Sequence, residues 1–299
     1  MHIVIVDPSR VALKVISGLL TPRGHFVYAF TDSREALVFL SDNDFVDALI
    51  TSLEVQPIAG LELCWQARLL AETRRPLYII AMSSLHNTRN LGEALDSGAD
   101  DFISKPPSAE ELHARLRAAQ RLTSLQRELI RLAETDTLTG LLNRRAFTNR
   151  AREATERLGI NTPLALVLAD IDHFKVINDG HGHDVGDLAI QAVSAELEKV
   201  GGVAGRLGGE EFGVLLPGQT AIQATEVANT LRLRCQALLV KGHRGPVRLT
   251  CSFGISEWSD GETVEGLMKR ADIALYDAKA AGRNSVVTSR TDFVLAKTA

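Results

Sequence analysis

The sequence predicts a doubly wound α/β domain, then a long coiled-coil helix, and then an α+β domain. Three observations support this order. Short apolar runs alternate with helical periodicity over residues 1–107, leucines recur at helical spacing over 108–135, and a different order of strands and helices follows over 136–290. A chain of 299 residues is long enough for two domains that each bury a core. We therefore expect domains at 1–115 and 136–290, joined by a helical linker and followed by a tail at 291–299.

The composition excludes several classes of protein. The chain has 45% hydrophobic and 23% charged residues, and its formal net charge of −4 provides no broad basic surface for nucleic acid. Three scattered cysteines, Cys64, Cys235 and Cys251, lack the spacing of metal ligands and are expected to be reduced core thiols. No apolar run approaches the roughly 18 residues that cross a membrane, and the N-terminus lacks the apolar segment of a signal peptide. We expect a cytoplasmic protein without nucleic-acid or membrane partners.

The first domain is predicted from its regular alternation of strands and helices. Five short apolar runs separated by helical patterns are typical of a parallel sheet that is covered on both faces. In that architecture, functional residues lie at the carboxyl ends of the strands. We expect strands at 2–6, 25–30, 48–51, 77–82 and 101–104, and helices at 9–20, 33–40, 61–71 and 87–97.

Four polar residues lie at the ends of these strands: Asp7, Ser52, Ser83 and Lys105. Over residues 1–115 this pattern resembles the receiver domain of response regulators. The resemblance implies that Asp7 corresponds to a magnesium-binding acid and Ser83 to the switch hydroxyl. It also implies that Lys105 is the lysine of the family's Lys-Pro element.

Two departures from the receiver pattern argue against phosphorylation. Ser52 stands where the phosphate-accepting aspartate is expected, and Pro8 replaces the second acid. Serine cannot form the acyl phosphate, and proline offers no carboxylate to a metal ion. We therefore interpret the domain as a pseudo-receiver in which Asp7 pairs with Lys105. Such a domain could hold a constitutive dimer, or it could bind an unknown signalling partner or ligand.

Residues 108–135 predict one long helix that continues the last helix of the first domain. Ser108 fits an N-cap, and Glu111 follows at the spacing of a capping box. At 1.5 Å per residue the segment forms a rod of roughly 40 Å. The helix either packs on its own domain or pairs two chains in a parallel coiled coil, which we favour because its C-terminal half extends past that domain. The apolar stripe comprises Leu112, Leu116, Ala119, Leu122, Leu125, Leu129 and Leu132.

The second domain is predicted to be an α+β, ferredoxin-like domain from the order of its elements. A buried apolar strand is followed by a helix, a hairpin and a further helix, and the same kinds of element recur towards the end. We expect helices at 143–158, 184–199, 220–239 and 263–281, strands at 164–169, 248–256 and 285–287, a hairpin at 206–216, and a glycine- and histidine-rich loop at 180–183.

The stretch 206–212 is the most unusual part of the sequence. Gly208 and Gly209 allow a tight turn with positive φ, which would place Glu210 and Glu211 at the tip of a hairpin. On their own, these could be two solvated surface acids. The second domain's first strand, however, ends in Asp170, and three carboxylates at one point require a cation. Oxygen ligands of this kind suit Mg²⁺ or Mn²⁺. The backbone N–H groups and lysine of the following turn suit a phosphate chain, so the pattern favours nucleotide chemistry.

Five motifs in this domain resemble the GGDEF family, the diguanylate cyclases, in its Gly-Gly-Glu-Glu-Phe variant. The resemblance covers about 155 residues and is specific, because the motifs occur in the family's order. The motifs are Asp-Thr-Leu-Thr-Gly-Leu-Leu-Asn-Arg-Arg at 136–145, Asp-Ile-Asp-His-Phe-Lys-Val-Ile-Asn-Asp at 170–179, Gly-His-Asp-Val-Gly-Asp at 182–187, Gly-Gly-Glu-Glu-Phe at 208–212 and Lys-Ala-Ala-Gly-Arg-Asn at 279–284.

The resemblance implies a role for each matching residue. Asp170 and the carbonyl of Ile171 would hold Mg²⁺, and Glu210 and Glu211 would complete a site for two divalent ions per GTP. By the family's usual assignment, Glu210 would also help to deprotonate the attacking 3′-hydroxyl. Guanine would be bound by Asn178 and Asp187, and the phosphates by His173, Phe174, Lys175, Lys279 and Arg283.

Structural alternatives exist for some of these residues. Asp187 lies near the start of a helix that Asp184 is expected to cap, where an acid is favoured in any case. Lys279 lies near a helix C-terminus, which favours a cation without any ligand. Asn178 could simply end a turn.

The implied reaction is the condensation of two GTP molecules into cyclic di-GMP, with release of two pyrophosphates, at the interface of a homodimer. One domain holds half of a site, and the helix at 108–135 would bring two halves together. The alternative is a catalytically silent GGDEF domain that binds nucleotide or a partner in a signalling protein. The family's Arg-x-x-Asp product site corresponds here to Lys199-Val-Gly-Gly202, which lacks both charged residues, so product inhibition through it is expected to be weak.

Overall fold

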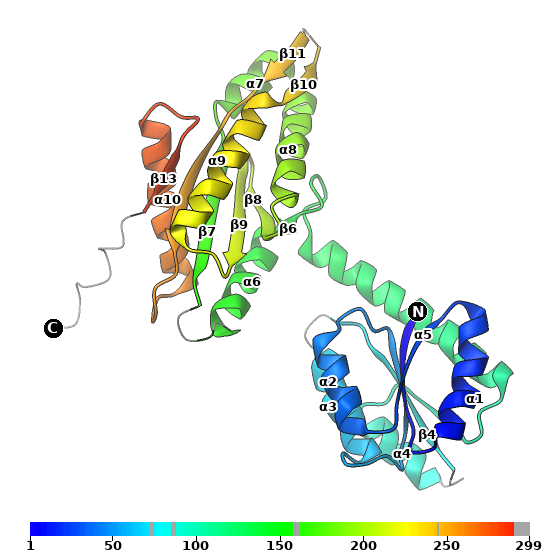
Figure 1. The fold of residues 1–299 in the computed structure, drawn as a ribbon. Helices are drawn as coiled ribbons and strands as arrows, with labels where there is room; N and C mark the ends of the chain where they lie inside the picture. Colours follow the sequence, from blue (N-terminus) through cyan, green and yellow to red (C-terminus); the bar gives the residue numbers. More distant parts are fainter. Residues whose placement is uncertain (72–74, 85–87, 158, 160–161, 244, 290–299) are drawn as a thin grey trace. The chain divides into compact units, whose positions relative to one another are not determined.

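The structure is a computed structural model that describes residues 1–71, 75–84, 88–157, 159, 162–243 and 245–289. Within this part, the chain forms two compact units, Met1–Arg131 (unit 1) and Leu132–Ala299 (unit 2) (Figure 1). The tail expected at 291–299 lies outside the described residues. The same holds for residues 87 and 158, which are end residues of two expected helices.

Unit 1 is the parallel α/β domain that the sequence predicts. Its elements are β1 (His2–Val6), α1 (Arg10–Leu20), a 3-10 turn (Thr21–Arg23), β2 (Phe26–Phe30), α2 (Ser33–Asp42), β3 (Ala48–Ser52), α3 (Gly60–Ala71), β4 (Tyr78–Ser83), α4 (Thr88–Asp96), β5 (Asp101–Ser104) and most of α5 (Ala109–Glu134). The strands pair in the order β2-β1-β3-β4-β5, and all four pairings are parallel. The carboxyl ends of the strands therefore lie along one edge of the sheet.

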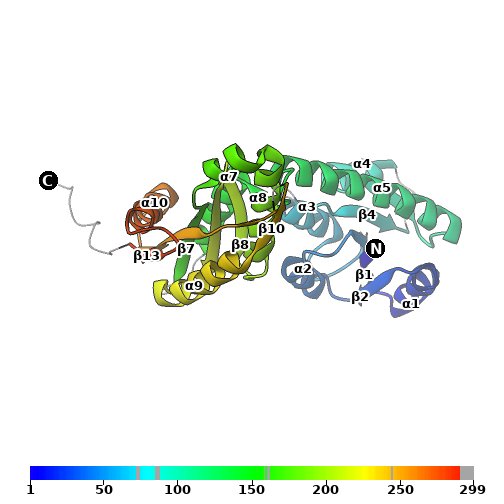
Figure 2. The ribbon, with the colours of Figure 1, turned by 90° about the horizontal axis from the view of Figure 1, so that it is seen from above.

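Both faces of this sheet are buried by helices. On one face α1 and α5 pack through residues such as Ile16 and Leu116, and on the other α2, α3 and α4 pack through residues such as Leu40 and Leu63. Figure 1 shows α2 and α3 on one side of the sheet and α1 on the other, and Figure 2 shows the same arrangement from above. This double cover explains why the strands consist almost entirely of apolar residues.

Helix α5 divides into a buried and an exposed half. Its N-cap is confirmed, because the Glu111 amide donates to Ser108 Oγ at 3.1 Å. The first part of the stripe packs on its own unit, since Leu112 and Leu116 are at most 1% exposed. The second part is open, with Leu125 at 64% and Leu129 at 66%. Packing on its own unit is thus confirmed for the first half of the stripe. The exposed half leaves an apolar row without cover within the described residues, and its pairing with a second chain stays a prediction.

Unit 2 is an α+β domain with one mixed sheet. Its elements are β6 (Leu142–Asn143), α6 (Arg144–Arg157), β7 (Leu164–Ile171), α7 (Phe174–His181), α8 (His183–Glu198), β8 (Val203–Gly208), β9 (Glu211–Pro217), α9 (Ala221–Ala237), β10 (Leu239–Gly242), β11 (Gly245–Arg248), β12 (Cys251–Glu257), α10 (Val264–Ala280) and β13 (Val286–Thr288). The sheet order is β13-β12-β7-β9-β8-β6, and β10 and β11 form a separate hairpin. The central strand β7 is buried along its whole length and is antiparallel to both neighbours.

Helices cover both faces of this sheet. Helices α8 and α9 pack on one face, with α7 at its edge, and α6 and α10 pack on the other. The second core contains Phe147, which is fully buried. Its ring lies against two glycines of neighbouring strands, Gly205 and Gly213, where an added Cβ would come within 2.8 Å and 2.6 Å of the ring. The Phe147 ring therefore fills the space that larger side chains at positions 205 and 213 would occupy.

Three local predictions for unit 2 differ from the structure. A helix, α7, occupies 174–181, where the sequence predicted a turn followed by a loop, because Phe174 and Ile177 recur at helical spacing and pack on the core. The strand expected at 248–256 is divided into β11 and β12. Helix α8 starts after Gly182, which has φ of 93°, so Asp184 is not its cap. The Asp184 side chain instead contacts His243 at 2.7 Å.

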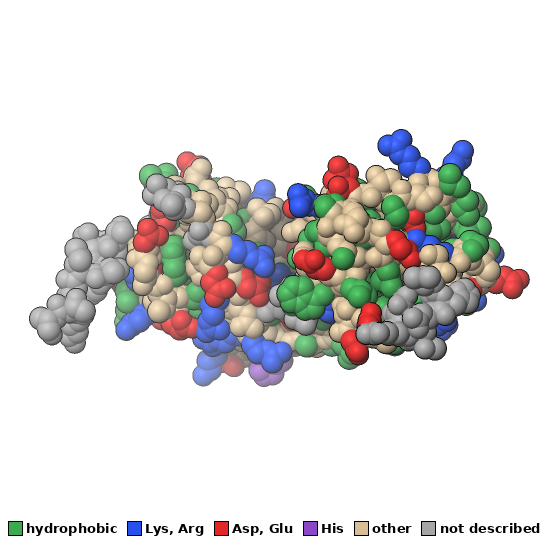
Figure 3. All heavy atoms as spheres, turned by 90° about the horizontal axis from the view of Figure 1, so that it is seen from below, with side chains coloured by type: hydrophobic (Ala, Val, Ile, Leu, Met, Phe, Trp, Pro, Cys, Tyr) green, Lys and Arg blue, Asp and Glu red, His purple; other side chains and the backbone are tan. Residues whose placement is uncertain are grey.

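No helix in the described part of the chain is both long enough and apolar enough to cross a membrane. On the face drawn in Figure 3, acidic and basic side chains are interspersed and form no field of one sign. This distribution fits the small net charge of −4.

Candidate functional site

The site is built around the end of β7. Asp170 is the second-last residue of that strand and is 5% exposed. In the antiparallel ladder it lies directly opposite Glu211 of β9. Directly opposed residues project from the same face of a sheet, so these two carboxylates share the face that α10 covers. Lys279, in the last turn of α10, places its Nζ 2.8 Å from Asp170 Oδ2.

The glycine turn between β8 and β9 carries the third acid, Glu210, whose charge acts on Asp170. Gly209 has φ of 48°, as the sequence predicted, and its carbonyl accepts a hydrogen bond from Arg206 Nε at 2.9 Å. The Arg206 guanidinium also binds Asp136 at 3.1 Å, which connects the turn to the first motif of the domain. Although burial alone would raise it, hydrogen bonds from Thr139 and Arg206 hold the pKa of Asp136 below its usual value. The turn is therefore fixed on both sides.

Lys279 only partly compensates the negative charge around Asp170. Burial, together with the charges of Glu210 and Glu211, raises the pKa of its carboxyl to about 6, although the hydrogen bond and charge of Lys279 act to lower it. A group with this environment gains from additional positive charge. The charges of Glu210 and Glu211 thus act on Asp170, and their convergence on one cation stays a prediction.

The same acids do not converge closely enough to form a metal site in this conformation. Among the described residues, no three His, Cys, Asp or Glu side chains are placed to hold a metal ion. The physical reason is that Lys279 already provides the counter-charge of Asp170, while Glu210 and Glu211 repel it. The donor set nevertheless fits a hard divalent cation, since it consists of carboxylate oxygens beside a buried acid of raised pKa.

The residues expected to bind guanine lie on α7 and α8. Asn178 of α7 packs directly on Gly186 of α8, where an added Cβ would come within 1.9 Å of Asn178 Oδ1. That oxygen is buried and has no hydrogen-bond partner among the described residues. Asp187, the next residue of α8, is exposed. The structure thus has a buried amide oxygen on α7 packed against α8, the helix that carries the exposed Asp187 carboxylate, and both groups are hydrogen-bond acceptors.

The residues expected to bind phosphates surround the same strand end. His173 has φ of 55° and is the residue that turns the chain from β7 into α7. Phe174 packs partly into the core, and Lys175 is exposed. Arg283 is also exposed and has φ of 66°, in the turn that follows α10. Of the expected phosphate ligands, only Lys279 touches an expected metal ligand in this structure, through its ion pair with Asp170.

Asp172 is a residue of the site region that sequence reasoning missed. It is 4% exposed and accepts three hydrogen bonds, from Thr250 Oγ1 at 2.7 Å, Ser252 Oγ at 2.7 Å and the Asn284 amide at 2.9 Å. Asn284 directly follows Arg283 and also has positive φ, of 43°. Asp172 therefore ties the end of β7 to the turn that carries a predicted phosphate ligand. Its signal in the sequence was only its position two residues after Asp170.

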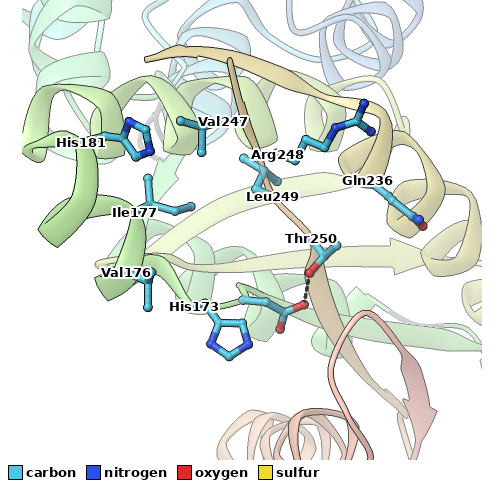
Figure 4. A pocket seen from close by; sticks show the side chains of 10 residues that line it. His173, Val176, Ile177, His181, Gln236, Val247, Arg248, Leu249 and Thr250 are labelled. Carbon is cyan, nitrogen blue, oxygen red and sulfur yellow. Dashed lines mark hydrogen bonds between the residues drawn. The ribbon is translucent and has the colours of Figure 1, made fainter. Parts of the chain in front are cut away.

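A cavity of about 430 Å³ lies beside the Asp172–Thr250 hydrogen bond. Figure 4 shows His173, Val176, Ile177 and His181 of the α7 region on one side of it and Gln236 and Arg248 on the other, with the Thr250 hydrogen bond below. Of the predicted site residues, His173 alone lines it. The cavity does not include Asp170, Glu210 or Glu211, so it is a separate hollow beside the acids.

In unit 1, the four predicted residues do lie together at the carboxyl edge of the sheet. Lys105 Nζ is 2.7 Å from Asp7 Oδ2 and also donates to Ser52 Oγ. Glu54, which sequence reasoning missed, contacts Ser52, Ser83 and Lys105. The expected pairing of Asp7 with Lys105 is thus confirmed, and it belongs to a larger network.

Family models match both units. The response regulator receiver domain matches residues 3–117, and the diguanylate cyclase GGDEF domain matches residues 133–285. Among curated proteins, the response regulator PleD of Caulobacter vibrioides is 35% identical over 257 residues, which cover 81% of this chain and 56% of PleD. The diguanylate cyclase DgcM of Escherichia coli is 30% identical over 264 residues, which cover 83% of this chain and 64% of DgcM. This chain therefore spans less than two thirds of the length of either relative.

Two solved structures are each similar to 60% of this chain. The coiled coil and GGDEF domain of DgcB from Caulobacter crescentus, in complex with c-di-GMP, matches with a TM-score of 0.54 at 33% identity, over 60% of this chain and 99% of that one. The diguanylate cyclase SiaD of Pseudomonas aeruginosa, in complex with its activator SiaC, matches with a TM-score of 0.52 at 35% identity, over 60% of this chain and 72% of that one.

The Asp172 tie leads to a stability prediction. We expect Asp172→Ala to lower the free energy of unfolding of unit 2 by about 3 kcal/mol, because it leaves two hydroxyls and an amide without their acceptor. Asp260→Ala, at an exposed acid of the same unit, should change it by less than about 0.5 kcal/mol. Urea denaturation followed by Trp258 fluorescence, in a Trp65→Phe background, measures both. Equal effects of the two substitutions would show that the tie contributes nothing.

Proposed function

The chain belongs to the diguanylate cyclase GGDEF-domain family, and we propose that it condenses two GTP molecules into cyclic di-GMP with release of two pyrophosphates. The observation that carries this proposal is the glycine turn at 208–209, which places Glu210 and Glu211 beside the buried Asp170. An arrangement that concentrates negative charge beside a strand end is unfavourable by itself and is accounted for by divalent cations that bind there together with the nucleotide.

We propose that Asp170, the Ile171 carbonyl, Glu210 and Glu211 hold Mg²⁺ or Mn²⁺, two ions per GTP. When bound, these ions neutralise the phosphates and lower the pKa of the 3′-hydroxyl. Lys279 then has a second task. Once Asp170 has another counter-charge, the Lys279 ammonium is available for a phosphate oxygen, and Arg283 on the turn tied to Asp172 can join it.

The remaining residues position the reactants. We propose that Asn178 and Asp187 accept hydrogen bonds from the guanine edge, which presents donors where adenine presents an acceptor and thereby favours GTP over ATP. The αL turn at His173 directs the first backbone N–H groups of α7 towards the phosphate chain. Glu210 accepts the proton of the attacking 3′-hydroxyl. Most of the rate enhancement comes from orientation, because each 3′-oxygen must face the α-phosphorus of the other GTP.

One unit 2 provides one GTP site, so the reaction needs two chains. We propose that the exposed half of α5 forms a parallel coiled coil between them. The support is the row of open leucines, Leu122, Leu125, Leu129 and Leu132, which no described residue covers and which lies on the helix leading directly into unit 2. The alternative function, a silent GGDEF module that only binds nucleotide or a partner, would need no such pairing.

Replacing the proposed base separates these two functions. We expect Glu210→Gln to lower the rate of cyclic di-GMP formation by about a thousandfold, because the amide can neither accept the proton nor bind the ion as strongly. Wild-type protein, GTP and Mg²⁺, with product quantified by chromatography, give the reference rate. Glu226→Gln, at a helix position away from the site, should keep that rate. A wild-type dimer that binds GTP but forms no cyclic di-GMP would establish the silent module.

The leucine row predicts how dimerisation and activity are linked. We expect Leu125→Glu to weaken the dimer by at least about tenfold, because a carboxylate would be buried in the seam. Gln126→Glu introduces the same charge at the neighbouring exposed position of the helix and should leave the dimer intact. Sedimentation velocity measures the association, and activity per chain should fall in parallel. A Leu125→Glu protein that remains dimeric would contradict the proposed interface.

The segment 199–202 predicts weak product inhibition. Lys199 pairs with Glu196 at 2.6 Å, and a Cβ at Gly202 would lie 2.5 Å from the Leu215 carbonyl oxygen, so this position has no room for an acid. We expect the initial rate to be unchanged by saturating cyclic di-GMP, apart from competition at the GTP site. Initial rates over a range of GTP concentrations test this, and strong non-competitive inhibition would refute it.

A further inference from the structure

The centre of the network in unit 1 is Glu54, two residues after β3. Its Oε1 accepts from Ser83 Oγ at 2.9 Å and from the Ser84 amide and hydroxyl, both at 3.2 Å. Its Oε2 accepts from Ser52 Oγ at 2.5 Å and from Lys105 Nζ at 3.0 Å. Five donors from three segments thus surround one carboxylate.

This set of donors is that of an oxyanion site. An ammonium, three hydroxyls and a backbone N–H all face one point, and together they can satisfy a carboxylate or a phosphate, which are acceptors only when fully ionised. A simple surface ion pair would need Lys105 alone. Burial acts to raise the pKa of Glu54, but the hydrogen bonds from Ser52, Lys105, Ser83 and Ser84 outweigh it and lower the pKa to about 2. The carboxylate is therefore ionised throughout the neutral range.

The donors come from the ends of three neighbouring strands. Ser52 ends β3, Ser83 ends β4 and Lys105 follows β5. Backbone hydrogen bonds connect the same positions, from the Leu53 amide to the Met82 carbonyl at 2.8 Å and from the Lys105 amide to the Ser83 carbonyl at 2.9 Å. One carboxylate thus joins the carboxyl ends of three of the five strands, and the Ser83 residue among its donors is only 1% exposed.

Two features of the sequence allow this arrangement. Ser52 is neutral, so it can donate to Glu54, whereas an aspartate at this position would repel it. Lys105 can serve two acids because it lies between Asp7, at 2.7 Å, and Glu54, at 3.0 Å. A phosphate-accepting aspartate would carry its phosphoryl group into the same space in front of Ser83 and Lys105.

We propose that unit 1 contains an oxyanion-binding site formed by Ser52, Ser83, Ser84 and Lys105, and that Glu54 is its built-in ligand. The site holds the ends of β3, β4 and β5 in one conformation without phosphorylation. It is closed to an external carboxylate or phosphate as long as Glu54 is present. Because the Glu54 side chain is still 37% exposed, removal of its carboxylate opens the donors to solvent and to small anions.

The test uses the full chain and follows hydrogen exchange, so its result is independent of cyclase activity. Wild type, Glu54→Ala, Glu54→Gln and a control, Glu110→Gln, are compared by hydrogen–deuterium exchange and mass spectrometry. Segments 78–84 and 101–105 should exchange about tenfold faster in Glu54→Ala, because the charged acceptor that joins the three strand ends is lost. Glu54→Gln, which keeps the size of the side chain and one acceptor oxygen, should lie in between. Glu110→Gln, at an exposed acid of α5, should match wild type.

Added anions then distinguish a ligand site from a structural link. Sodium acetate or inorganic phosphate should restore protection in Glu54→Ala and leave wild type unchanged, while sodium chloride at equal ionic strength should not. Recovery with acetate alone identifies a carboxylate site, and recovery with phosphate a site that also accepts a tetrahedral anion. Unchanged exchange in both Glu54 variants would overturn the proposal. Faster exchange that neither anion reverses, or that chloride reverses equally, would also overturn it. Should Glu54→Ala not fold, Glu54→Gln carries the exchange comparison.

Discussion

Unit 2 depends on one electrostatic constraint, namely that the buried carboxylate of Asp170 at the end of β7 must have a positive partner. In this structure Lys279 provides it at 2.8 Å, although Glu210 and Glu211 still raise the pKa of Asp170. The glycine turn and the Arg206–Asp136 pair hold the acids beside each other against their repulsion. The fold thus maintains an excess of negative charge at one place, which the divalent cations of the proposed substrate complex would relieve.

In unit 1, a buried carboxylate at a strand end is likewise compensated by a lysine, together with other groups of the same unit. Asp7 is also buried at a strand end, and Lys105 compensates it, but here the network is completed by hydroxyls and by a carboxylate of the same chain. No acid of this group is left without donors. One chain therefore carries two carboxylate sites at sheet edges. The site in unit 1 is satisfied by groups of the same unit, and in the proposed function Lys279 of the site in unit 2 would exchange Asp170 for a phosphate oxygen.

The sequence predicted the features that depend on neighbours along the chain. Strand and helix periodicity indicated both sheets, Gly208 and Gly209 indicated the turn, and Ser108 the start of α5. The missed features depend on residues far apart in sequence: Asp172 meets Ser252 across 80 positions, and Glu54 meets Lys105 across 51. No local pattern encodes such a contact. Helix α7 was missed because its turn-like glycine and histidine content hid a short apolar repeat that becomes decisive only when it packs on the core.

The contact between Gly186 and Asn178 also depends on the tertiary packing of two helices, and it bears on nucleotide selection in the proposed function. The distance between α7 and α8 is set by a missing atom, since even one methyl group at position 186 would collide with the amide oxygen that is proposed to face the base. Gly186 itself would touch neither guanine nor metal. The discrimination between two nucleobases would thus depend on the spacing of α7 and α8. A change of base preference in evolution could then begin at a residue that does not contact the ligand.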